Sequence, residues 1–149
     1  MIKTNWNPGS NDSITFSNII EQIKKHTLLK GTVYIGTDSF FIKDDCIFAT
    51  AICLYGADNQ QGGRYFFTKS RINKNKFPEL SIRMIKEAEN TINLSNTIMD
   101  EVPNAMLELH LDISPQAKML VGYVKGSGYE CKIKPYAFAA ASIADKHSK

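Results

Sequence analysis

The sequence MLELHLDI, at residues 106–113, alternates strictly between apolar and polar side chains. Leu107, Leu109 and Leu111 fall on one side of this segment, and Asp112 falls on the other. A period of two residues is typical of a β-strand that buries one of its faces. The segment therefore predicts a strand whose carboxyl end carries Asp112.

Three more strands are predicted before this segment. Each is rich in β-branched, aromatic and aliphatic residues, and they are TVYIGT at 32–37, CIFATAICLY at 46–55 and RYFFT at 64–68. The links between them are short and rich in turn formers, so we expect antiparallel hairpins. The first of these strands is predicted to end with Asp38.

Helical periodicity marks the remaining segments. Apolar spacing of three and four residues predicts an N-terminal helix over 15–26 and a long helix from Pro78 to about Ile98. A short helix over 115–124, a strand over 129–133 and an Ala-rich helix over 137–147 complete the chain. The order α-βββ-α-β-α-β-α indicates an α/β fold with one mixed five-stranded sheet, because strands joined through helices usually run parallel.

Composition indicates one globular domain of ordinary type. The chain has 149 residues, of which 43% are hydrophobic and 22% are charged, and its formal net charge is +3. We expect a flexible N-terminal segment over 1–13 and a single domain over 14–149. Three cysteines without a CxxC pair and the lack of a long apolar run predict a cytoplasmic protein that does not enter membranes.

The topology brings two distant carboxylates toward one place. If the strands that end with Asp38 and Asp112 are parallel neighbours, both side chains lie at the same edge of the sheet. Ligands of open α/β sheets bind at the carboxyl ends of the parallel strands. The sequence therefore predicts a carboxylate site there, although a turn at a strand end is the simpler explanation for either residue alone.

Five segments together resemble a known family. They are VYIGTDS (33–39), GGRYFF (62–67), RMIKEAENTI (83–92), ELHLDIS (108–114) and KIKPYAFAAASIADKHS (132–148). In this order they resemble the YkuK family of predicted ribonuclease H-like nucleases, and the resemblance covers residues 14–149. It implies the ribonuclease H-like βββαβαβα fold, here with an extra N-terminal helix, and hydrolysis of RNA or DNA with Mg²⁺ or Mn²⁺.

The resemblance also implies a set of metal ligands: Asp38, Glu87, Asp112 and Asp145. Two-metal phosphodiester hydrolysis needs such hard oxygen ligands. Glu87 is preferred to Glu89 because it matches the family pattern, and a solvated helix residue is the alternative. Asp145 follows Pro135 by ten positions, so it joins the site only if its helix starts late. His110 is expected to be a packed, hydrogen-bonded residue and not a ligand.

A basic run is the candidate substrate-binding segment. The run spans residues 69–76 and contains four cations and no acid: Lys69, Arg71, Lys74 and Lys76. Lys134, near the predicted fifth strand, is a further candidate. Lys and Arg of this kind bind the phosphates of nucleic acid, although a solvated loop is the common alternative. Two other functions compete with a nuclease: an inactive nucleic-acid-binding or interaction module, and a phosphotransferase, which would need a second domain.

Overall fold

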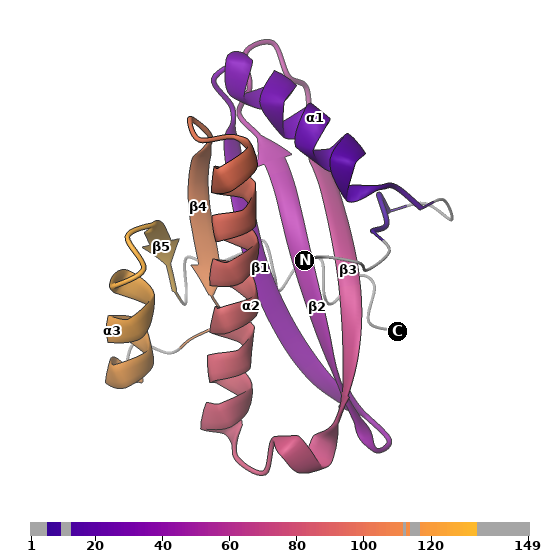
Figure 1. The fold of residues 1–149 in the computed structure, drawn as a ribbon, viewed down its shortest axis with the longest axis vertical. Coiled ribbons are helices and arrows are strands. Elements are labelled where there is room, and N and C mark those ends of the chain that lie inside the picture. The colour runs from indigo at the N-terminus through magenta and orange to yellow at the C-terminus, as the bar shows by residue number, and fades with distance from the viewer. Residues whose placement is uncertain (1–5, 10–12, 112, 114–116, 134–149) are drawn as a thin grey trace.

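The computed structural model describes residues 6–9, 13–111, 113 and 117–133. A five-stranded sheet with the order β3-β2-β1-β4-β5 forms its centre, and the helices α1 and α2 cross one of its faces (Figure 1). The strands are β1 (Thr32–Ile42), β2 (Asp45–Tyr55), β3 (Arg64–Asn73), β4 (Met106–Leu111) and β5 (Glu130–Lys132). The helices are α1 (Phe16–Leu28), the short 3-10 helix η1 (Lys74–Lys76), α2 (Leu80–Glu101) and α3 (Lys118–Lys125).

Strand pairing confirms the expected mixed sheet. β1, β2 and β3 pair antiparallel, whereas β4 pairs parallel with β1 and β5 pairs parallel with β4. The hairpin links are too short for anything but antiparallel pairing, and the long connection through α2 returns the chain in the same direction as β1. The predicted last helix, over 137–147, lies outside the described residues.

The strands of the hairpins are longer than predicted. β1 continues to Ile42 and β3 continues to Asn73, because β2 offers both of them backbone partners from Asp45 to Leu54. The predicted strands stopped where polar residues appear, yet polar side chains are tolerated on the outer part of a paired strand. α2 begins at Leu80, two residues after Pro78, so Pro78 is not its first residue.

The main core lies between the sheet and its helices. Ile19 and Ile23 from α1, and Ile98 from α2, are fully buried against sheet residues such as Ile35 and Leu109. Full burial of one such side chain contributes roughly 1.5–3 kcal/mol. The opposite face of the sheet carries a smaller cluster of Ala51, Cys53 and Phe67, with Tyr34, Tyr55 and Tyr65 packed against it.

Part of the N-terminal segment belongs to this packed structure. Trp6 is 1% exposed, and Asn7 exchanges two backbone hydrogen bonds of 2.9 Å with Phe67 of β3. The sequence predicted ordered structure only from about Ile14, because the turn formers before it are typical of a tail. In the structure the Trp6 indole packs beside Phe16, and this contact holds residues of that segment in place. Among the described residues, no helix is long and apolar enough to span a membrane.

Candidate functional site

Asp38 does not close its strand, as was expected, but lies within it. β1 runs four residues further, to Ile42, since its antiparallel pairing with β2 continues to the turn. The Asp38 side chain is half-buried, and its Oδ1 accepts a 2.9 Å hydrogen bond from the backbone N–H of Ser39. Among the described residues, the parallel pairing with β4 reaches Thr37, the residue before Asp38.

The last described pair between β1 and β4 is Thr37 with Leu111. These residues directly precede Asp38 and Asp112 in the sequence. The predicted parallel neighbourhood of the two strands is therefore confirmed. Asp112 itself lies outside the described residues, so its approach to Asp38 stays a prediction.

Glu87 is the buried acid of α2. Its side chain is 4% exposed, and the Ser39 hydroxyl donates a hydrogen bond to its Oε2. Glu89, two residues later, is half-buried. An ionised carboxylate loses much hydration when it is buried, so it needs donors such as this hydroxyl. The sequence analysis selected Glu87 but not Ser39. The available signal was the position of Ser39: it follows Asp38 directly, so strand alternation places its side chain on the opposite, apolar face of β1.

A cluster of threonines holds α2 in this position. Thr91 Oγ1 donates a 2.8 Å hydrogen bond to Thr37 Oγ1, which lies 3.1 Å from Thr50 Oγ1 of β2. Thr91 is one helical turn after Glu87, so both contacts lie on the same side of the helix. The polar contacts at Thr37 and Ser39 thus fix the face of α2 that carries Glu87.

Asp38 and Glu87 flank β1 from opposite faces. Side chains alternate along a strand, and Thr37 and Ser39 both contact α2, so Asp38 points to the other face. The last described residue of β4, Leu111, pairs with Thr37, one residue before Asp38. At this level the backbone of β1 lies between the two carboxylates.

The face that carries Asp38 also holds a buried histidine. His110 of β4 is 1% exposed, and its Nε2 lies 2.8 Å from Glu108 Oε2. Tyr34 packs against the imidazole with ring centroids 5.2 Å apart. Burial lowers the pKa of His110 and outweighs the opposing effect of Glu108, so the ring is neutral at pH 7 and donates its Nε2–H to the carboxylate. The expectation of a packed, hydrogen-bonded histidine is confirmed.

The basic run was alternatively interpreted as a solvated loop, but in the structure it belongs to a strand and a short helix. Lys69 and Arg71 are exposed residues of β3, and Lys74 and Lys76 form η1. In the sheet register Lys69 pairs with Ala49, which pairs with Asp38. Strands lie about 4.8 Å apart, so the backbones at Lys69 and Asp38 are about 10 Å apart.

Two cations of the run form ion pairs with the acids of the β1–β2 turn. Arg71 lies 3.4 Å from Asp45, and Lys74 lies 3.7 Å from Asp44. All four side chains except that of Asp45 are largely exposed, so these pairs contribute little stability. Lys69 and Arg71 share the face of Asp38, because register partners point to the same side of a sheet.

Three of the predicted site residues, Asp112, Asp145 and Lys134, lie outside the described residues. Within the part of the chain that is described, no three His, Cys, Asp or Glu side chains lie close enough together to hold a metal ion. Of the predicted metal ligands, Asp38 and Glu87 lie within the described residues.

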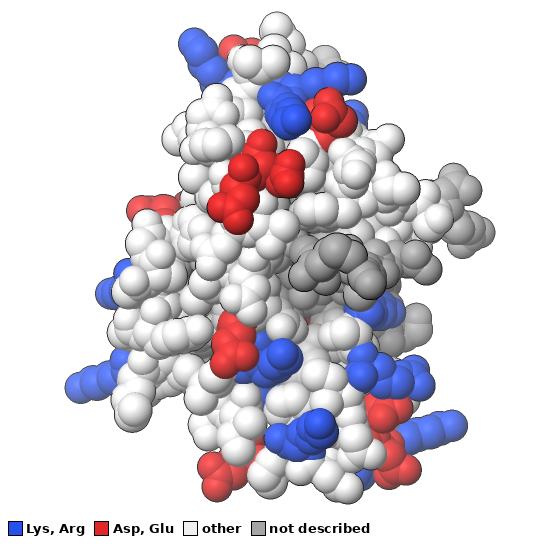
Figure 2. Space-filling view, viewed as in Figure 1, with Lys and Arg blue, Asp and Glu red and all other residues white. Residues whose placement is uncertain are grey.

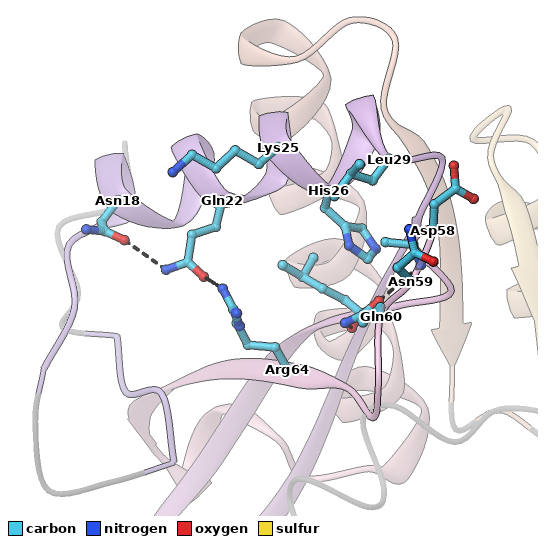
Figure 3. A pocket seen from close by; sticks show the side chains of 11 residues that line it. Asn18, Gln22, Lys25, His26, Leu29, Asp58, Asn59, Gln60 and Arg64 are labelled. Carbon is cyan, nitrogen blue, oxygen red and sulfur yellow. Dashed lines mark hydrogen bonds between the residues drawn. The ribbon is translucent and has the colours of Figure 1, made fainter.

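A pocket of about 540 Å³ lies away from these carboxylates, where α1 meets the β2–β3 loop (Figure 3). Lys25 and Arg64 line one side of it, and Asp58 lines the other. His26, at its back, is 6% exposed, and its Nε2 lies 2.9 Å from Thr32 O and 3.1 Å from Tyr55 O. These contacts make His26 a structural link between α1 and the sheet.

The strand order, the mixed pairing and the position of α2 define an α/β protein with one mixed five-stranded sheet. The family model described as Ribonuclease H-like matches residues 15–149, and the chain belongs to this family. The resemblance seen in the sequence is thereby confirmed. Neither the curated proteins nor the solved structures include a match to this chain.

Proposed function

We propose that this protein is a metal-dependent nuclease that hydrolyses phosphodiester bonds of RNA or DNA. The observation that supports it most strongly is the register of β1 and β4, which pairs the residues that precede Asp38 and Asp112. Asp38, Glu87, Asp112 and Asp145 are the proposed ligands of Mg²⁺ or Mn²⁺.

The donor set near Asp38 suits a hard cation. Asp38 and Glu87 offer carboxylate oxygens, which Mg²⁺ and Mn²⁺ prefer. Cys46 lies on the same side of the sheet as Ser39, and its pKa is raised, mainly by burial. Its thiol therefore stays protonated and provides no thiolate for a softer metal. When bound, a pair of divalent cations supplies an activated water and stabilises the leaving oxygen.

The residues around the carboxylates have separate roles in this proposal. Ser39 orients Glu87 through its hydrogen bond. Lys69 and Arg71, which share the face of Asp38, bind substrate phosphates, and Lys74, Lys76 and Lys134 extend this contact. His110 is neutral and buried, so it neither binds phosphate as a cation nor supplies a proton at the surface. The three cysteines are free, in accord with the proposed cytoplasmic location.

A direct assay tests the proposal. Labelled single-stranded RNA and DNA, duplexes, hybrids and branched junctions are incubated with Mg²⁺, Mn²⁺ or EDTA. We expect hydrolysis that requires the metal and that Asp38→Asn and Asp112→Asn abolish, whereas Asp58→Asn, an exposed loop variant, retains it. Full hydrolysis by both site variants would overturn the proposal and would indicate a contaminating nuclease.

One observation favours a second candidate, a nucleic-acid-binding module without turnover. Asp38 and Glu87 flank β1 from opposite faces, and Glu87 already accepts a hydrogen bond from Ser39. A carboxylate held in this way can have a structural role alone. The same substrates distinguish the two candidates, because a binding module retains them in EDTA and does not cleave them in Mg²⁺ or Mn²⁺.

A further inference from the structure

The β1–β2 hairpin extends beyond the end of β4 and forms an arm, defined here as residues 38–49 (Figure 1). Near its tip, Phe41 and Ile42 are 48% and 41% exposed. Large apolar side chains on a hairpin tip are not required for the core. Their neighbours therefore decide what they are suited to contact.

Phe41 is supported from one side by Arg83 of α2. The Arg83 guanidinium carbon lies 4.8 Å from the centroid of the Phe41 ring. Arg83 Nε is buried and has no hydrogen-bond partner among the described residues. Arg83 precedes Glu87 by one helical turn, and Phe41 follows Ser39 by two residues on the same face of β1.

A groove of about 460 Å³ lies beside the Phe41 ring. Its apolar lining comes from Phe41, Phe77 and Pro78, and Phe77 is fixed by an edge-on contact with Phe48 at 5.2 Å. Lys43 and Lys74 lie at the same groove. A partly exposed aromatic ring beside lysines is suited to a flat, apolar group that is attached to a negative charge.

The surroundings of the groove carry an excess of cations over acids. Residues 43–45 and 69–86 contain seven Lys and Arg and three acids (Asp44, Asp45 and Glu79), which gives 7 − 3 = +4, against the net +3 of the whole chain. Figure 2 shows Lys and Arg side chains, with a few acids between them, at the lower end of the molecule, where Figure 1 places η1 and the β1–β2 turn. This excess of positive charge favours a polyanion.

We infer that the groove holds an unpaired nucleotide of a single-stranded nucleic acid, with its base stacked on Phe41 and its phosphates near Lys43 and Lys74. Base faces are free for such stacking in single strands, whereas in a duplex they are covered by their neighbours. The path of the nucleic acid beyond the groove rests on the proposed function. Phe41 and Ser39 are about 7 Å apart along β1, so a nucleic-acid strand bound at Phe41 passes the proposed carboxylates.

The test measures binding in EDTA, so that it does not depend on hydrolysis. Fluorescence anisotropy compares a labelled oligothymidine with a hairpin duplex of the same strand length. Phe41→Leu is expected to weaken single-strand binding about five-fold or more, since stacking on one aromatic ring contributes about 1–3 kcal/mol per base. Duplex binding should stay unchanged. Phe41→Trp, with a larger ring, should bind the single strand at least as tightly as the unmodified protein.

Tyr123→Leu is the matched control, because Tyr123 of α3 is also 48% exposed but lies away from the arm. Equal single-strand affinity of Phe41→Leu and the unmodified protein would overturn the inference, and so would an equal loss with Tyr123→Leu. If Phe41→Leu does not fold, Phe41→Trp decides the question: single-strand binding at least as tight as that of the unmodified protein supports stacking, and weaker binding overturns it. A Phe41-dependent interaction without hydrolysis in Mg²⁺ leaves the inference standing and overturns the nuclease proposal alone.

Discussion

The hydroxyl of Ser39 donates a hydrogen bond to the carboxylate of Glu87 and joins the middle of β1 to the second turn of α2 in a buried position. Removing the donor leaves the buried carboxylate with one fewer partner. Ser39→Ala is therefore expected to lower the free energy of unfolding by about 1–3 kcal/mol. Urea denaturation followed by circular dichroism measures it. Ser81→Ala, at an exposed position of α2, should change little; equal stability of both variants would contradict the assigned contact.

Metal binding can be separated from catalysis by thermal melting. If Asp38 and Glu87 bind Mg²⁺, the ion stabilises the folded state and raises the melting temperature of the unmodified protein. Asp38→Asn and Glu87→Gln should lose this increase while melting, in EDTA, at or above the temperature of the unmodified protein, because each replaces a half-buried or buried carboxylate, which is costly to desolvate, with a neutral amide of similar shape. Glu89→Gln is the control and should retain the increase. A loss of folding by both site variants would indicate a purely structural role.

Stability should depend on pH through His110. Burial lowers the pKa of this histidine in the folded protein below its ordinary value of 6.5. The unfolded chain therefore binds a proton more readily, and stability is retained above about pH 6.5 and lost as the pH falls toward the folded-state pKa. His110→Phe should remove this part of the pH dependence. The measurement is the urea midpoint of both proteins between neutral and mildly acidic pH. If the midpoint changed with pH equally in the two proteins, the prediction would be wrong.

A pair of glycine variants should have opposite effects. A Cβ at Gly31 would lie 2.2 Å from His26 Nε2, whose ring is fixed by two backbone carbonyls. Gly31→Ala should therefore destabilise the fold by about 1–3 kcal/mol. Gly122 is on α3 with open space around it, so Gly122→Ala should stabilise by about 0.5–1 kcal/mol. Melting temperatures that move in the same direction would show that the α1–sheet contact is misassigned.

Most of the fold could be predicted because its signals are local. Alternation at 106–113 and the short hairpin links correctly indicated the pairing of β1 with both β2 and β4. Strand ends were less predictable, since the continuation of β1 past Asp38 depends on a partner in β2 and not on the residues of β1. The ordered position of Trp6 was missed for the same kind of reason, because the backbone of its neighbour Asn7 pairs with Phe67, far along the chain.

The candidate site could be predicted only in part. Helical periodicity placed both Glu87 and Glu89 beside the apolar face of α2, and only the family resemblance favoured Glu87. Its partner Ser39 is 48 residues away and comes from a different element. The placement of Asp38 on the opposite face of β1 needed the exact register of the sheet. The roles of Asp112 and Asp145 stay predictions.

The basic run can be tested through the salt dependence of nucleic-acid binding. If Lys69, Arg71, Lys74 and Lys76 contact phosphates, replacing all four with Ala should weaken binding to every substrate sequence alike, because such contacts carry little base information. The dependence of affinity on salt should also become shallower, by up to about 0.9 units of log–log slope for each lost contact with duplex DNA. Mg²⁺-dependent stabilisation should persist, since none of these residues is an oxygen ligand.

A variant of opposite sign makes this measurement specific. Arg71 and Lys74 now pair with Asp45 and Asp44, and a phosphate must compete with these carboxylates. Asp44→Asn/Asp45→Asn releases both cations and raises the local charge by two, so it should tighten binding and steepen the salt dependence. Affinities measured over a range of salt concentrations give both answers. Slopes that stay the same in both variants would show that the run is a solvated surface and that the nucleic acid follows another path over the protein.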